Sequence, residues 1–195
     1  MTGLLRRAVR DLDRFLTRRM DTVELWDHPD SLFHGELLDA DRPLELEDRT
    51  LPPGTPVLRL HLLNEEVPEI AAEGPDLAWA ALGRRRLLDS LRATARRLRT
   101  DPRLAAVQAV GGETVLLSTN TETRDHTLLS RLGFTVRPYG GAGRFGTFWE
   151  NVYSWMLIWA YNPGTMGSRS FRDLRRAEAW ISREGFLDRF LKDDP

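Results

Sequence analysis

Two pairs of side chains have the types that acid–base chemistry needs. His61 and Asn64 come at the end of the apolar stretch "VLRLHLLN", and ligands of α/β proteins often bind where strands end. Asp125 and His126 place an acid next to a base in "TETRDHTLL". Neighbours on a helix point about 100° apart, which works against cooperation between these two. His61, Asp125 and His126 are the catalytic candidates and Asn64 is a ligand-binding candidate; the alternative for His61 and Asn64 is a structural hydrogen bond.

A run of three arginines could bind phosphate. Arg84, Arg85 and Arg86 lie in "GRRRLLDSLRATARRLRT", where Asp89 is the only acid. A guanidinium group binds phosphate or carboxylate through two parallel hydrogen bonds, so we take the three as ligand-binding candidates. A solvated helix face and an acidic protein partner are the alternatives.

The apolar periodicity predicts the elements that position these residues. Leu87, Leu88, Leu91, Ala95 and Leu98 recur at helical spacing, which predicts a long helix over about 77–99. Three strands are expected before it, and after it one or two strands with a bend at Gly111-Gly112, a short helix and a strand. The expected ranges are 22–27, 32–39, 56–64, 104–118, 122–132 and 134–139. This order predicts a mixed α+β domain over residues 1–140, with a helical extension over 141–195.

The first twenty residues predict an amphipathic helix. An apolar stripe that includes Leu5, Leu12 and Phe15 runs beside several arginines, and those arginines break any secretory signal. We expect the stripe to pack on the domain, with docking to an anionic membrane as the alternative. No segment reaches the length of a membrane span. The expected location is therefore cytoplasmic, with peripheral contact to the inner face of the membrane left open.

Composition excludes several classes of function. The chain has 195 residues and a formal net charge of −1, which gives no field to attract nucleic acid. It has no cysteine, so thiol nucleophiles and thiolate metal sites are excluded. Its four histidines lie in different elements without the spacing of metal ligands, and we predict no metal site.

An aromatic segment follows a glycine-rich turn in the last third of the chain. Trp149 and Trp155 belong to "FWENVYSWMLIWAY", which predicts a helix that is apolar nearly all round. Such helices are usually buried in a core or in a subunit interface, for example in a homodimer. A platform for stacking sugar rings and an interfacial membrane anchor are the alternatives, and under the first both tryptophans bind ligand. A last helix is expected over about 170–190.

The long leucine helix and "LLSRLGFTV" together resemble the Gcn5-related N-acetyltransferase fold across about residues 1–139. In that family a glycine-containing loop grips the pyrophosphate of acyl-CoA at the start of the helix. Here Trp79, Leu82 and Arg84 stand at the motif positions, with Gly83 one residue out of register. Leu129 stands where a tyrosine often protonates the leaving thiolate. The resemblance therefore implies the family's frame without its usual chemistry.

A narrower resemblance covers about residues 5–140. The stretches "LDRFLTR", "VLRLHLLN", "AVQAVGGETVLL" and "LLSRLGFTV" are similar to the YkoP-like domain, a bacterial family found alone or attached to polysaccharide deacetylases. This resemblance implies an association with cell-envelope polysaccharide metabolism. The missing loop glycines and tyrosine favour a non-catalytic module that binds a small molecule, a glycan or a protein partner and has no cofactor. The alternative is a divergent acyltransferase that uses acyl-CoA, with Arg84, Arg85 and Arg86 on its phosphates and His61 or Asp125 as base.

Overall fold

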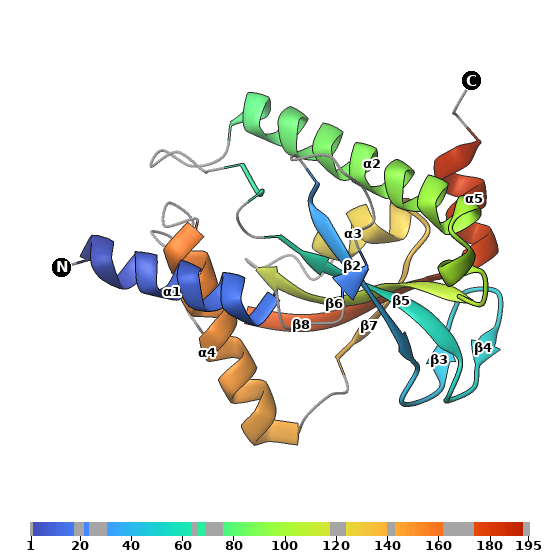
Figure 1. Cartoon of the computed structure of the whole chain (residues 1–195), viewed down its shortest axis with the longest axis horizontal. Helices are drawn as coiled ribbons and strands as arrows, with labels where there is room; N and C mark the ends of the chain where they lie inside the picture. The colour runs from blue at the N-terminus through green and yellow to red at the C-terminus, as the bar shows by residue number, and fades with distance from the viewer. Residues whose placement is uncertain are drawn as a thin grey trace.

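A six-stranded mixed sheet runs through the protein and is flanked by helices, an α+β architecture (Figure 1). The structure is a computed structural model that describes residues 2–17, 22–23, 31–63, 66–68, 76–117, 124–139, 143–161 and 174–192. The strands of this sheet are β1 (Thr22–Val23), β2 (Phe33–Asp39), β5 (Pro56–Leu62), β6 (Ala109–Leu117), β7 (Thr135–Pro138) and β8 (Leu174–Ser182). Their spatial order is β1-β2-β5-β6-β8-β7.

One neighbouring pair in this sheet is parallel. β5 and β6 pair from Val57↔Ala109 to Arg59↔Gly111, whereas the other pairs, β1–β2, β2–β5, β6–β8 and β8–β7, are antiparallel. A parallel pair requires a crossover connection, which the long helix between β5 and β6 supplies. The remaining elements are α1 (Thr2–Thr17), α2 (Leu77–Thr100), α3 (Arg124–Arg131), α4 (Gly143–Tyr161), α5 (Arg183–Leu191), the 3-10 turn η1 (Pro102–Leu104) and a two-stranded hairpin of β3 (Leu44–Glu45) and β4 (Thr50–Leu51).

The larger core lies between the sheet and α2 with α5. Leu58 of β5, Leu91 and Leu98 of α2, and Phe186 of α5 are at most 2% exposed in one cluster. Burial of each such side chain contributes about 1.5–3 kcal/mol, which fixes α2 along one face of the sheet. The start of α2 is capped by Asp76, whose carboxylate accepts a hydrogen bond from the backbone N–H of Trp79 at 2.7 Å.

A smaller core lies on the opposite face of the sheet. Val57 follows the alternation of a strand, so it points away from Leu58 and packs with Leu44 and Leu51 of the β3–β4 hairpin. α1 and α4 contact each other and lie farther along this same side (Figure 1). The second face is thus covered at its two ends, and the central strands lie between these covers.

Close backbone approach explains the two glycines of β6. A Cβ atom on Gly111 would lie 2.1 Å from the Ala179 carbonyl oxygen, and one on Gly112 would lie 2.8 Å from the Leu60 carbonyl oxygen. Both obstacles are backbone atoms of the strands on either side. The expected bend at Gly111-Gly112 is wrong: β6 continues through both residues, and glycine is needed for packing between strands.

The expected helix over 170–190 and the purely helical extension are wrong. Residues 174–182 form strand β8, which pairs with β6 on one side and β7 on the other, and only Arg183–Leu191 form a helix. The spacing of Leu174, Ala177 and Ile181 fits a helix, but the two neighbouring strands supply a ladder that overrides this local pattern. The sheet therefore crosses the expected boundary at residue 140.

The other expected elements in the described ranges are confirmed with shifted bounds. The long helix is Leu77–Thr100, and the aromatic segment is helical over Gly143–Tyr161. Expected strands and the short helix correspond to β1, β2, β5, β6, α3 and β7. The β3–β4 hairpin was not expected, because each of its strands has only two residues and carries too few positions to show a period.

Candidate functional site

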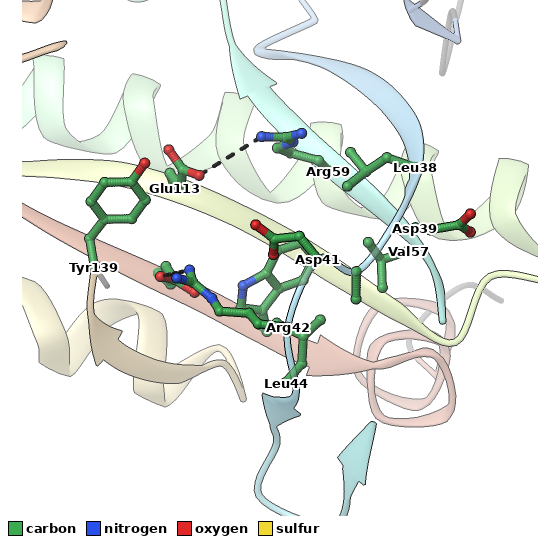
Figure 2. Close-up of a pocket in the computed structure, with 12 residues that line it drawn as sticks. Leu38, Asp39, Asp41, Arg42, Leu44, Val57, Arg59, Glu113 and Tyr139 are labelled. Carbon is green, nitrogen blue, oxygen red and sulfur yellow. Dashed lines mark hydrogen bonds and ion pairs between the residues drawn. The ribbon is translucent and has the colours of Figure 1, made fainter. Parts of the chain in front are cut away.

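A cleft of about 660 Å³ opens on the sheet face that carries Val57, on the side away from α2 (Figure 2). It lies between the central strands, the β2–β3 connection and the residue after β7. Its apolar floor includes Leu38, Leu44 and Val57. The polar and aromatic residues of its wall are Asp39, Asp41, Arg42, Arg59, Glu113, Tyr139, Glu178 and Trp180. The volume of the cleft falls within the range of small-molecule sites.

One side of the cleft is held by an ion pair between Arg42 and Glu178. Arg42 belongs to the β2–β3 connection, whereas Glu178 lies in the middle of β8 and is 8% exposed. A carboxylate at this depth requires a cationic or hydrogen-bonding partner, and the guanidinium group of Arg42 supplies one. The pair therefore ties the β2–β3 connection to the centre of the sheet.

A second charged network crosses three neighbouring strands. Arg59 of β5 lies between two acids, with its Nε 3.1 Å from Glu36 Oε2 of β2 and its Nη1 3.8 Å from Glu113 Oε1 of β6. Figure 2 shows the side chains of Arg59 and Glu113 reaching toward each other. Glu36 also accepts a hydrogen bond from His61 Nε2 at 2.8 Å. The imidazole of His61 is thus oriented by a carboxylate, as in many acid–base dyads.

Two aromatic residues face the charged groups. Trp180 of β8 stands opposite Gly111 of β6, where a Cβ atom would lie 2.7 Å from the indole ring, so glycine leaves the space that the indole occupies. The indole Nε1 is buried and has no hydrogen-bond partner among the residues that the structure describes. Tyr139 follows β7, and the guanidinium carbon of Arg176 lies 5.9 Å from its ring centre. These rings give the cleft two rigid contact surfaces.

The charge balance of the cleft is negative. Four lining residues are acidic, Asp39, Asp41, Glu113 and Glu178, against the two arginines Arg42 and Arg59. Both arginines are already in ion pairs. A ligand that enters the cleft therefore meets an excess of carboxylates, which disfavours anions and favours neutral or cationic groups.

The ladder between β5 and β6 ends beside this network. Their pairing ends at Arg59↔Gly111, although β5 continues to Leu62 and β6 to Leu117. Beyond this point the backbones remain paired with their outer neighbours, β2 and β8. The ladder between the two parallel strands thus stops before their carboxyl ends, although they are still close at the next position, where a Cβ atom on Gly112 would lie 2.8 Å from the Leu60 carbonyl oxygen.

The arginines singled out in the sequence lie on the other side of the sheet. Arg84 and Arg85 are exposed on α2, while Arg86 is half-buried and donates a hydrogen bond to the Glu66 carbonyl at 2.9 Å. Because α2 packs on the face that carries Leu58, these three do not meet the cleft. Trp79, Leu82 and Arg84, where the acyltransferase motif expects a glycine loop, are all within α2.

The remaining expected site residues do not meet in one place. His61 lies on the cleft face next to the network. Asp125 and His126 are in α3 and Trp149 is in α4, and their side chains fall outside the described part. Trp155 is half-buried on α4. Asn64 lies outside the described residues.

Sequence reasoning missed most of the residues that line the cleft. Arg42, Glu113, Glu178 and Trp180 were not singled out. The signal for Glu113 and Glu178 was a lone acid inside an apolar strand, in "AVGGETV" and "RRAEAWI". Their proximity depends on the Glu113↔Glu178 register, which only the fold reveals.

Two features are absent from the described ranges. No group of three or more histidine or acidic side chains there could hold a metal ion. No helix among the described elements has the length and apolar character needed to cross a bilayer.

The comparisons with known proteins give no relative. No family model, curated protein or solved structure matches the chain. The structure is therefore that of a mixed α+β protein with a charged cleft, lined in part by aromatic residues, on one face of its sheet.

Proposed function

We propose that this protein is a binding module for a polyhydroxylated small ligand, a saccharide of the cell envelope, and that it binds this ligand without catalysis. The cleft carries the proposal: two aromatic rings, Trp180 and Tyr139, face carboxylate and guanidinium groups on one wall. Sugars present apolar C–H faces that pack on flat rings, and hydroxyl groups that bond to planar polar side chains. The resemblance to the YkoP-like domain motivates the choice of an envelope saccharide.

The charge of the cleft restricts the classes of saccharide that can bind. Four acids against two arginines favour a neutral or amine-bearing saccharide over a phosphorylated or uronic-acid one. The proposal therefore ranks three probes, with a glucosamine trimer binding best, an N-acetylglucosamine trimer next and a galacturonate trimer worst.

The indole N–H of Trp180 offers a direct test. In a protein with ¹⁵N-labelled tryptophan, we expect the glucosamine trimer to shift the Trp180 indole signal saturably. Trp180→Phe should weaken binding about tenfold, equivalent to about 1.4 kcal/mol. Trp79→Phe is the matched control, because Trp79 lies on α2, away from the cleft, where its indole N–H donates to the Pro68 carbonyl. Absence of saturable binding by all three trimers would exclude the proposal.

A second candidate is acyl transfer from acyl-CoA, favoured by the early end of the ladder between β5 and β6. A slot between two parallel strands beside the start of a long helix is what the Gcn5-related frame needs for its cofactor. His61, held by Glu36, would accept the proton as an amine attacks the thioester and the thiolate leaves. Against it, the carboxylate of Asp76 occupies the helix start where a pyrophosphate would bind.

Thermal denaturation separates the two candidates. Acetyl-CoA should raise the Tm only under acyl transfer, and replacing Arg84, Arg85 and Arg86 together should abolish the shift. The matched control replaces Arg92, Arg96 and Arg99 in the same helix. His61→Gln should then remove acyl transfer to an amine while leaving the Tm shift in place. No shift with any acyl-CoA excludes the second candidate.

A further inference from the structure

Two arginines of α1 contact aromatic side chains of α4. The guanidinium carbon of Arg6 lies 5.2 Å from the ring centre of Trp159, and that of Arg10 lies 5.2 Å from the ring centre of Tyr161. Arg10 also donates two hydrogen bonds to the carbonyl oxygen of Ala160, at 3.1 and 2.6 Å. These contacts orient α1 on α4 by its basic side.

The apolar stripe of α1 is consequently turned outward. The side chains of Leu5, Leu12 and Phe15 are 61%, 46% and 51% exposed. Positions 5, 12 and 15 fall within about 80° of one another around a helix, so they form one strip. The sequence predicted that this stripe packs on the domain, and the exposure of Leu5 and Leu12 shows that this prediction is wrong for these two residues.

This strip is the one place where exposed large apolar residues gather in the described ranges. The described ranges contain seven exposed large apolar residues, of which three form the strip. The other four come from four different elements: Leu37, Leu62, Leu77 and Leu128. Single exposed leucines are ordinary, whereas a strip on an amphipathic helix indicates a partner surface.

The charge beside the strip indicates the chemistry of that partner. Residues 2–19 contain six arginines and two aspartates, a surplus of four positive charges. Arg7 is exposed and lies about 80° around the helix from Phe15, at one edge of the strip. An apolar strip with a basic flank fits a surface that is anionic outside and apolar beneath.

We propose that α1 docks this protein on an anionic lipid bilayer. The helix lies in the plane of the interface, with Leu5, Leu12 and Phe15 among the acyl chains and Arg7 against lipid phosphates. Arg6 and Arg10 hold the helix on α4, so the whole fold follows α1 to the membrane. This inference does not depend on the ligand of the cleft.

Vesicle sedimentation of the full chain tests the docking. Vesicles of phosphatidylcholine with an equal share of phosphatidylglycerol should sediment the protein, pure phosphatidylcholine should sediment much less, and added salt should weaken the binding. The double variant Leu5→Gln/Leu12→Gln should lower the partition coefficient at least about tenfold, because two leucine side chains no longer enter the interface. Leu77→Gln/Leu128→Gln removes two exposed leucines elsewhere and should leave partition unchanged.

Several results would overturn the proposal. One is equal sedimentation with both vesicle types; another is equal loss in the two double variants. A third is a dimer in solution that Leu5→Gln/Leu12→Gln converts to a monomer, without vesicle binding by the parent protein, which would assign the strip to a second copy of the chain. If the first double variant does not fold, as judged by circular dichroism, Arg7→Gln replaces it and should reduce binding to the anionic vesicles.

Discussion

Arg42 and Glu178 form an ion pair although 136 residues separate them in the chain. The pair joins the β2–β3 connection to a strand that is contributed by the last quarter of the sequence. It is also one wall of the cleft, so the same contact serves the stability of the fold and the shape of the site.

Arg42→Met should reduce the free energy of unfolding by about 1–3 kcal/mol, because Glu178 at 8% exposure loses its ion-pair partner. The measurement is urea denaturation at neutral pH. Arg49→Met is the control: its partners Asp48 and Glu184 are 46% and 61% exposed, and solvent screens these pairs, so a much smaller change is expected. Equal losses in the free energy of unfolding would mean that burial does not strengthen the ion pair between Arg42 and Glu178.

Alanine should have opposite effects at two glycines. Gly112→Ala should destabilise the protein by about 1–3 kcal/mol, because the new Cβ would lie 2.8 Å from the Leu60 carbonyl oxygen. Gly83→Ala in α2 meets no atom within 4 Å and should stabilise by about 0.5–1 kcal/mol through helix propensity. Thermal and urea denaturation measure both. Stabilisation by Gly112→Ala would contradict the close approach of β5 and β6.

Arg183 binds the carboxyl end of α2 to α5. It donates hydrogen bonds to the carbonyl oxygens of Leu98 and Leu104, each at 2.7 Å. Arg183→Met should cost about 1–3 kcal/mol, because it removes these donors and a cation from the negative end of the α2 dipole. Arg189→Met is matched to it, since Arg189 donates to the Arg131 carbonyl at an exposed site, where water can replace it. Comparable losses in the free energy of unfolding for the two variants would contradict a special role of Arg183 at the end of α2.

Asp101 should give the protein an acid-sensitive contribution to stability. The side-chain hydrogen bond from Arg103, together with the Arg103 backbone N–H, lowers the pKa of Asp101 from 3.8 to about 2. Between these values the unfolded chain binds more protons than the folded protein, so the contribution is complete above about pH 4 and is lost as the pH falls through about 2.

The Tm difference between the parent protein and Asp101→Asn measures that contribution. It should be largest at neutral pH and shrink toward zero as the pH falls to about 2. Arg103→Gln should reproduce the same pH dependence, because it removes the other partner. A difference in Tm that is independent of pH would show that the charge of Asp101 does not contribute to stability.

Local patterns predicted α2 and β5 because both bury a regular stripe. Leu91 and Leu98 are at helical spacing and are almost completely buried, and Val57 and Leu58 alternate between the two cores of the sheet. β8 was misread because its residues satisfy two periods. Only pairing with β6 and β7, which are distant in the sequence, decides between them.

The site was less predictable than the fold. His61 was singled out, but its partner Glu36 comes from β2 and meets it only through the β2–β5 register. Glu178 looked like a solvated charge in a helix, whereas in a central strand it faces the cleft. A sequence shows which residue types are present, and the pairing of distant strands determines which of them meet.

The place of β8 has a consequence for the order in which this protein can fold. β8 lies between β6 and β7, although both precede it in the chain. During synthesis, β6 and β7 leave the ribosome before the strand that joins them, and each offers an unpaired edge until residues 174–182 arrive. Such edges are aggregation-prone. Nascent chains that stop short of β8 are therefore the form of this protein that most needs a chaperone.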